Sequence, residues 1–245
     1  MAFAGIGRRV EGFHAVVAAV AAGRVERLFI EESRLRRDDY EALAAAARGR
    51  GVDVEAVDDV RTIAETSAPQ GVVADAHAIP GVSLEAVAAV VDPSAVVVLD
   101  HLEEVRNVGA VARTALAAGI PAMVVPSRRA APVSAAAFKA AAGALEHVAV
   151  ATVSSTARAV DQLRTLGLWI VGLDGGADQS IFGLDLLSEP VAVVIGAEGK
   201  GLSRLVAERC DGLYRIPMLG ETESLNASVA AALAVYEIAR VRGSL

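Results

Sequence analysis

The feature that most limits the fold is a regular alternation of short apolar runs with alanine-rich segments through the second half of the chain. Runs such as Ala95 to Leu99 and Val191 to Ile195 are apolar throughout, which is typical of strands buried on both faces. The segments between the runs place apolar residues at helical spacing. The pattern therefore predicts an α/β fold with a parallel sheet and helices on both faces. The expected strands are residues 95–99, 122–125, 148–153, 169–173, 191–195 and 213–216.

Composition supports this fold class and excludes others. The 245 residues are 54% hydrophobic but only 4% aromatic, so the core must consist of Val, Leu, Ile and Ala. No apolar run approaches the roughly 18 residues of a membrane span, and the first residues lack the apolar region of a signal peptide. We therefore expect a cytoplasmic protein without a membrane partner. The lone Cys210 cannot form an internal disulfide, and the four histidines have no ligand spacing, so we expect no metal site.

The first 77 residues predict a separate small α/β domain. Helices are expected at residues 12–22 and 38–48, and strands at residues 25–31, 52–57 and 71–76. Residues 78–93, with proline and glycine at their edges, are expected to be a linker, and residues 94–245 the second domain. The net charge of −7 argues against a polyanion partner, yet Arg34, Arg36 and Arg37 cluster in the first domain. Whether they form a patch on one face or are separately solvated stays open.

The stretch from Glu189 to Asn226 predicts a ligand site. A buried strand leads into a loop with three glycines, and after a second short strand Ser224, Leu225 and Asn226 open a helix. The apolar positions Val229, Leu233 and Tyr236 of this helix fall at helical spacing. Two strand ends and a helix start can offer backbone groups to one small polar ligand. The glycine spacing fits neither a phosphate-binding P-loop nor a dinucleotide fingerprint.

A second candidate lies after the strand at residues 95–99. Asn107 is expected to be the N-cap of a helix with an apolar stripe at Val108, Val111, Ala112, Ala115 and Leu116. Arg113 falls off this stripe, where a solvated arginine is the default. It nevertheless follows the carboxyl end of a strand, where open α/β sheets place their ligands.

Three ordered motifs in these stretches resemble those of the SpoU (TrmH-like) RNA ribose 2′-O-methyltransferase family of the SPOUT superfamily. They are N-V-G-A-V-A-R-T-A-L-A-A-G (107–119), V-I-G-A-E-G-K-G-L (194–202) and I-P-M-L-G-E-T-E-S-L-N-A-S-V-A (216–230). Residues 5–77 also resemble the L30e-like RNA-binding domain of the ribosomal-RNA members. Pro69 stands where many relatives have histidine before Gln-Gly.

The resemblance implies an S-adenosylmethionine-dependent enzyme with a deep trefoil knot in its C-terminal domain and no metal. It also implies a homodimer, in which the catalytic arginine of one subunit lies near the methyl donor of the other. The cofactor-binding positions by the family pattern are Leu173, Gly196, Ile216, Met218 and Leu225. The catalytic positions are Arg113, Asn107, Glu198, Ser224 and Asn226.

The role of Arg113 stays open between two versions. It either acts as the base in a desolvated pocket, or it clamps the adjacent phosphate while another group takes the proton, which suits a guanidinium better. Asn107, Ser224 and Asn226 could singly be helix caps, and Glu198 an acid favoured by a helix dipole.

The resemblance favours large-subunit ribosomal RNA as the substrate. A tRNA 2′-O-methyltransferase and an antibiotic-resistance rRNA methyltransferase are the alternatives within the family. A non-catalytic RNA-binding or ribosome assembly protein, and an α/β enzyme of ordinary topology that binds NAD or ATP, are the alternatives outside it.

Overall fold

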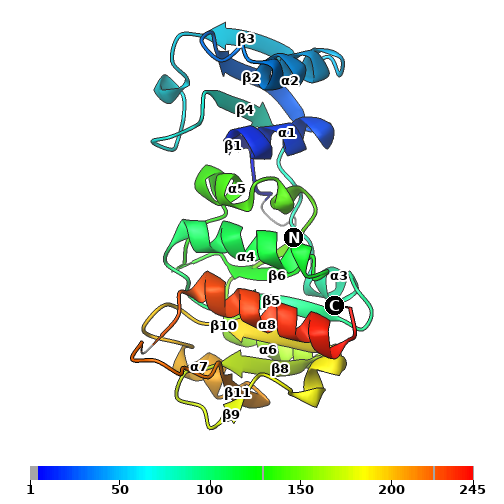
Figure 1. Cartoon of the computed structure of the whole chain (residues 1–245). Helices are drawn as coiled ribbons and strands as arrows, with labels where there is room; N and C mark the ends of the chain where they lie inside the picture. The colour runs from blue at the N-terminus through cyan, green and yellow to red at the C-terminus, as the bar shows by residue number, and fades with distance from the viewer. Residues whose placement is uncertain (1–4, 129, 223, 245) are drawn as a thin grey trace.

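The computed structural model describes residues 5–128, 130–222 and 224–244, which form two separate sheets (Figure 1). The smaller sheet has the strand order β1-β4-β2-β3. Its elements are β1 (Arg9–Glu11), α1 (Phe13–Ala21), β2 (Val25–Glu31), α2 (Asp38–Arg48), β3 (Asp53–Val57), η1 (Val60–Thr62) and β4 (Val72–Ala76). Strand β1, which pairs antiparallel with β4, is not predicted from the sequence, because three residues are too few to show a period.

The larger sheet has the order β7-β6-β5-β10-β8-β11-β9, and every pair of neighbours is parallel. Its strands are β5 (Ala95–Leu99), β6 (Ala122–Pro126), β7 (Ala149–Val153), β8 (Trp169–Leu173), β9 (Gln179–Ser180), β10 (Val191–Ile195) and β11 (Gly212–Arg215). The predicted α/β class, with a parallel sheet and a separate small N-terminal domain, is confirmed.

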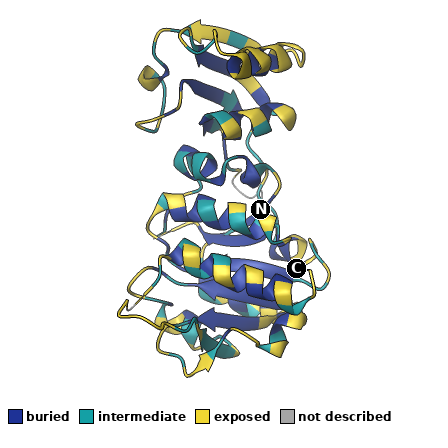
Figure 2. Cartoon of the chain, in the orientation of Figure 1, coloured by how far each residue is buried: buried dark blue, intermediate teal, exposed yellow. Residues whose placement is uncertain are grey.

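Helices cover both faces of this sheet, as the continuous apolar strands require. On one face, Val97 and Val193 share a core with α4 (Val105–Ala117) and α8 (Ala227–Val241). On the other face, Val96 and Val194 share a core with α3 (Leu84–Ala88), α6 (Thr156–Thr165) and α7 (Arg204–Ala207). Figure 2 shows the strands as a buried layer between helices with exposed outer sides. Short 3-10 helices η2 (Ala144–Glu146) and η3 (Asp185–Ser188) complete the domain.

Helix α5 (Ala135–Ala141) lies between the two sheets (Figure 1) and packs on both α4 and β1. An ion pair fixes this junction, because the guanidinium of Arg24 donates to both carboxylate oxygens of Glu146 at 2.6 and 2.5 Å. Both side chains are largely buried, so the bidentate pair is shielded from salt. The expected linker contains α3, which packs on α6, and the domain boundaries at 77 and 94 stay a prediction.

One detail of the predicted helices is wrong, and another helix has an unexpected outer face. Helix α4 begins at Val105, and its N-cap is Glu104, whose carboxylate accepts from the N–H of Arg106, so Asn107 lies inside the first turn. On α8 the buried face is built from other residues, including Ala231, Ala234 and Ile238. The apolar residues Val229, Leu233 and Tyr236, whose spacing indicated the helix, are 46%, 37% and 42% exposed. The α8 stripe, as we name these three residues, thus lies on the outer side of the helix.

Candidate active site

A cavity of about 360 Å³ lies at the carboxyl ends of β8, β10 and β11. Loops that follow three parallel strands meet there, together with the start of α8. The residues expected to bind the cofactor all line this cavity: Leu173, Gly196, Ile216, Met218 and Leu225. Glu198 and Ser224, expected at the catalytic site, line it as well. The structure therefore gathers residues from motifs that are far apart in sequence around one hollow.

The glycine loop after β10 is folded so tightly that its first residue has no room for a side chain. The N–H and C=O groups of Ala197 and Gly201 form two hydrogen bonds, of 3.0 and 2.8 Å. A Cβ atom at Gly196 would lie 2.2 Å from the carbonyl carbon and oxygen of Gly201. Gly199 and Gly201 also have positive φ values, 70° and 64°, which glycine adopts without strain.

A hydrogen-bonded cluster of Asn107, Glu198 and Asn226 joins α4, the glycine loop and α8. The Nδ2 atoms of Asn107 and Asn226 donate to Oε1 of Glu198 at 2.7 and 2.6 Å. Nδ2 of Asn226 also donates to Oδ1 of Asn107 at 3.1 Å. Asn107 is only 6% exposed, so its amide depends on these partners. Three of the five predicted catalytic residues are thus in direct contact.

Two residues of this cluster also stabilise the start of α8. The side chain of Asn226 is the N-cap, because its Oδ1 accepts from the N–H of Ser228 at 2.9 Å. Oε1 of Glu198 accepts weakly from the N–H of Ala227 at 3.4 Å, and a carboxylate there is favoured by the helix dipole. Asn226 and Glu198 therefore serve both the helix start and the cluster, and the two interpretations of these residues do not compete.

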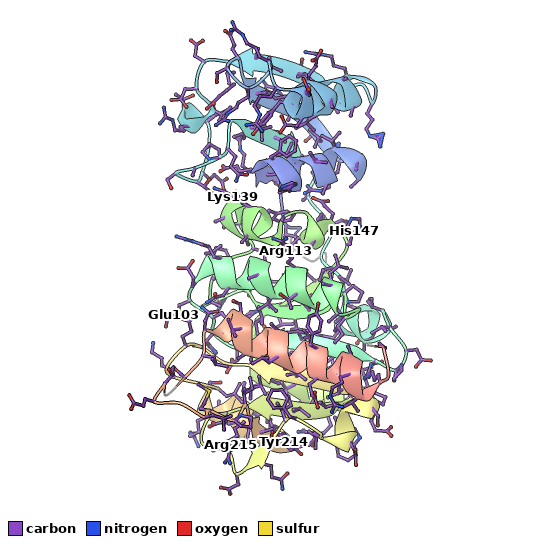
Figure 3. All side chains as sticks on the ribbon, in the orientation of Figure 1. Glu103, Arg113, Lys139, His147, Tyr214 and Arg215 are labelled. Atoms are coloured by element: carbon purple, nitrogen blue, oxygen red, sulfur yellow. The ribbon has the colours of Figure 1, made fainter. Side chains whose placement is uncertain are left out.

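Arg113 is placed apart from this cluster within one chain. It is exposed on α4 and lines a different hollow with Leu116, Ala141 and His147, near α5 (Figure 3). Ser224 is exposed at the edge of the cavity. A single chain thus brings Glu198, Ser224, Asn107 and Asn226 to the cavity region, but not Arg113.

Sequence reasoning missed several residues of the cavity. Asp174, Gly175 and Gly176 follow β8 directly and line the cavity opposite the glycine loop. The signal was present, since an acid and two glycines after a buried strand mark a loop at the ligand edge of a parallel sheet. Lys200 also lines the cavity, and its ammonium contacts Glu103 at 2.8 Å. This hydrogen bond lowers the pKa of the Glu103 carboxyl and raises the pKa of Lys200.

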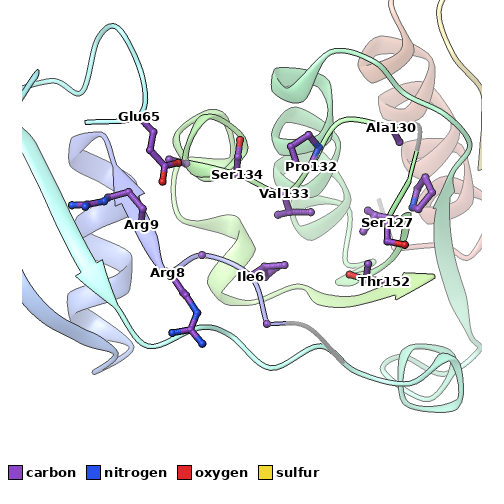
Figure 4. A pocket seen from close by; sticks show the side chains of 15 residues that line it. Ile6, Arg8, Arg9, Glu65, Ser127, Ala130, Pro132, Val133, Ser134 and Thr152 are labelled. Atoms are coloured by element: carbon purple, nitrogen blue, oxygen red, sulfur yellow. The ribbon is translucent and has the colours of Figure 1, made fainter. Parts of the chain in front are cut away.

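The described residues also form other hollows, but no group that could hold a metal ion. A cavity of about 370 Å³ lies between Arg8 and Arg9 on one side and Ser127 and Ser134 on the other (Figure 4). Among the residues that the structure describes, no group of three or more His, Cys, Asp or Glu side chains could hold a metal ion. None of the described helices has the length and apolar character to cross a membrane.

A cavity at the carboxyl edge of a parallel sheet, walled by a glycine loop and a helix start, is typical of α/β enzymes that bind a small-molecule cofactor. Residues 94–236 match the family described as SpoU rRNA Methylase. Residues 9–80 match the family described as RNA 2′-O ribose methyltransferase substrate binding. The chain belongs to the SpoU rRNA Methylase family, as its three motifs predicted.

Relatives at similar identity differ in length. A 23S rRNA (guanosine-2′-O-)-methyltransferase, RlmB, of Bordetella pertussis is 39% identical over 94% of this chain and 96% of its own length. An uncharacterized tRNA/rRNA methyltransferase of Synechocystis is also 39% identical, over 95% of this chain, but the chain spans only 62% of that relative. A putative TrmH family tRNA/rRNA methyltransferase of Bacillus subtilis is 46% identical over a shorter match, which covers 59% of this chain and 58% of that relative.

Solved structures share the whole fold. The SpoU methyltransferase AviRb from Streptomyces viridochromogenes superimposes with a TM-score of 0.79 at 27% identity, covering 96% of this chain and 90% of AviRb. The same enzyme in complex with the cofactor AdoMet gives a TM-score of 0.77 at 26% identity, covering 97% and 91%. The comparison supports the two-domain α/β fold over nearly the full chain.

Proposed function

We propose that this protein transfers a methyl group from S-adenosylmethionine to a ribose 2′-hydroxyl of RNA, with large-subunit ribosomal RNA as the substrate. One observation carries the proposal: the five positions expected to bind the cofactor line a single cavity, beside the Asn107–Glu198–Asn226 cluster. The family assignment and the rRNA methyltransferase name of the Bordetella relative support the reaction and the substrate class.

The cavity suits such a cofactor by size and chemistry. Its volume of about 360 Å³ lies within the range of roughly 300 to 1,000 Å³ found for small-molecule sites. Leu173, Ile216 and Leu225 offer apolar contact for a purine, and the glycine backbone allows close approach of polar groups. When bound, S-adenosylmethionine supplies an electrophilic methyl group on its sulfonium centre. The proposal includes no metal ion.

We assign to the polar cluster the role of holding the reacting groups in the geometry that methyl transfer requires. The attacking hydroxyl must approach the methyl group in line and lose its proton, so positioned polar groups are required. Glu198, held by two amides, and Ser224 lie at the cavity wall where an RNA ribose would enter. Arg113 has to stand beside the methyl donor in either of the two roles left open for it.

A homodimer would bring Arg113 to the cavity. The α8 stripe of Val229, Leu233 and Tyr236 is exposed apolar surface at helical spacing, next to α4, which carries Arg113. Two copies of this stripe packed around a two-fold axis would bury it and would bring α4 of one subunit toward the site of the other. We therefore propose a homodimer with shared active sites. The trefoil knot stays a prediction from the family.

The small domain is proposed to contact the RNA. Arg34 and Arg37 of the arginine cluster line one hollow with Phe13, His14 and Tyr40, so at least two of the three arginines share a face. The guanidinium of Arg37 lies 5.3 Å from the centre of the Tyr40 ring. The same guanidinium donates to both carboxylate oxygens of Asp39, at 3.0 and 2.8 Å, so Arg34 carries most of the positive charge of this hollow. Positive charge beside aromatic rings suits phosphates and unpaired bases of RNA, despite the acidic net charge.

The test is transfer of labelled methyl groups to purified ribosomal RNA and to tRNA, with S-adenosylmethionine binding measured separately by calorimetry. The proposal expects cofactor binding and 2′-O-methylated ribose in large-subunit rRNA. Cofactor binding with methylation of tRNA alone would identify tRNA, in place of rRNA, as the substrate. A protein that binds RNA but not S-adenosylmethionine would be the non-catalytic alternative.

A further inference from the structure

A cavity of about 610 Å³, separate from the cofactor cavity, opens at the carboxyl ends of β5, β6 and β7. Loops after these strands and the first residues of α6 and α7 line it, and the two cavities have no lining residue in common. We name it the α6 cavity. Its polar lining residues are His101, Arg128, Ser154, Ser155, Thr156, Ser203 and Arg204. The carboxyl edge of a parallel sheet is where α/β proteins bind ligands, so a second site at this edge is physically reasonable.

A buried hydroxyl in the wall of the α6 cavity has no partner. Thr156 lines the cavity and is only 4% exposed. Among the residues that the structure describes, nothing forms a hydrogen bond with its Oγ1 atom. A buried hydroxyl without a partner costs free energy. Because Oγ1 itself is buried, a ligand oxygen recovers this free energy when the Thr156 side chain turns toward the cavity.

Thr156 is also the first residue of α6, a helix of 10 residues. The N-cap is Ser155, whose hydroxyl accepts from the N–H of Arg158 at 3.4 Å. The other N–H groups of a first helical turn have no acceptor within the helix, and the helix dipole makes this end positive. Such an end, next to an unpartnered hydroxyl, suits an anionic oxygen ligand.

The charged side chains of the α6 cavity also favour an anion. Oε1 of Glu208 accepts from Arg204 at 2.7 Å, so this arginine is already paired, and Nδ1 of His101 lies 2.6 Å from Oδ1 of Asp100. Arg128 is exposed and forms no ion pair with any other described residue. Its guanidinium is therefore available to a ligand.

We propose that the α6 cavity binds a phosphate group through Thr156, the first turn of α6 and Arg128. The position suits a phosphodiester of the RNA substrate. That assignment rests on the proposed function, whereas binding of free phosphate would not depend on it. Asp100 connects the two cavities, since its N–H donates to Ile195 at 2.8 Å and its Oδ2 accepts from the N–H of Ser203 at 2.7 Å. Ile195 precedes the glycine loop and lines the cofactor cavity, and Ser203 lines the α6 cavity.

The experiment compares four variants of the full chain in two binding assays. Thr156→Val removes the hydroxyl at constant volume, and Arg128→Ala removes the unpaired charge. Thr165→Val and Arg158→Ala are matched controls at the far end of α6 and on its exposed side, outside the cavity. The probes are a labelled ribosomal-RNA fragment and inorganic phosphate, and calorimetry with S-adenosylmethionine checks that each variant keeps its cofactor site.

The proposal expects Arg128→Ala to weaken RNA binding about tenfold and Thr156→Val roughly threefold, with both controls unchanged. The slope of log affinity against log salt should fall by about 0.7 for Arg128→Ala if one phosphate contact to single-stranded RNA is lost. Loss of inorganic phosphate binding with unchanged RNA binding would assign the cavity to free phosphate. If RNA and phosphate bind both variants as they bind the controls, or if wild-type protein binds neither probe, the proposal is overturned. Arg128 is exposed, so its variant keeps the test decisive even if Thr156→Val folds poorly.

Discussion

Nδ2 of Asn107 donates a hydrogen bond of 2.7 Å to Oε1 of Glu198, although the two residues are 91 positions apart in the chain. This contact fixes the glycine loop after β10 to the first turn of α4, and Asn226 adds the start of α8 to the same carboxylate. Three segments that carry the family motifs therefore hold one another in place.

The first prediction concerns this contact. Asn107→Asp replaces the amide donor with a carboxylate, so the folded protein should lose about 1 to 3 kcal/mol of unfolding free energy at pH 8. The pKa of the paired carboxyls should lie above the unfolded value, because a shared proton restores the hydrogen bond. The loss should then shrink as the pH falls toward 5. Urea unfolding at both pH values measures it.

A double variant provides the control for this prediction. Asn107→Asp combined with Glu198→Gln exchanges acceptor and donor and should recover most of the lost stability at pH 8. An Asn107→Asp protein as stable as wild type at pH 8 would mean that the contact contributes nothing.

The second prediction concerns the glycine loop. Gly196→Ala would force a Cβ to within 2.2 Å of Gly201, so the loop must move and S-adenosylmethionine affinity should fall about tenfold or more. Gly220→Ala is the matched control, because this glycine lies outside the lining of the cavity and its Cβ would meet nothing within 4 Å. Calorimetry should find the control close to wild type, and equal losses in both variants would refute the role of the tight loop.

The third prediction concerns the α8 stripe. Val229→Asp places a charge in the proposed dimer interface and should shift the protein to monomers in sedimentation velocity at micromolar concentration. Val17→Asp is the matched control, since Val17 is 38% exposed on α1, away from that interface. A wild-type protein that sediments as a monomer would exclude the stripe as a dimer contact.

The fourth prediction concerns Cys210, the one cysteine of the sequence. Burial, with a smaller effect from the charge of Asp211, raises the pKa of its thiol to about 12. Because the thiolate is the reactive form, the folded protein at pH 8 should react with iodoacetamide at least ~100-fold more slowly than the protein in denaturant. The raised pKa also means that folding stability should fall as the pH rises above about 9. Rapid labelling of the folded protein at pH 8 would contradict this.

Local sequence patterns predicted the strands of the large sheet well. The bounds of β5, β8 and β10 agree with the expected runs, because a continuous apolar run between turn residues leaves little choice. The prediction that Asn107 is the N-cap of α4 was wrong, because a cap requires only one side-chain oxygen at the right place. Glu104 supplies this oxygen three residues earlier. The apolar spacing on α8 indicated the helix but not its buried face, because small alanines, including Ala231 and Ala234, are the buried residues and the larger ones lie outside.

The order of the strands and the contacts between residues far apart in sequence could not be predicted from local patterns. Nothing in the run Val191 to Ile195 indicates that β10 inserts between β5 and β8, and only that insertion places Glu198 beside Asn107. The cavity residues were expected through the family resemblance, since each is an ordinary glycine or apolar residue when taken singly. Asp174 and its two glycines could have been found from their place after β8.

The central claim is that Arg113 of one subunit serves the cofactor cavity of its partner, and mixed dimers test it most directly. Arg113→Lys should bind S-adenosylmethionine but transfer little methyl, whereas Gly196→Ala should not bind the cofactor well. When the two variants are unfolded, mixed equally and refolded, half of the dimers combine them, and each such dimer has one intact site. The account predicts recovery of about a quarter of wild-type methyl transfer. No recovery above the separate variants, or a fully active Arg113→Lys protein, would contradict it.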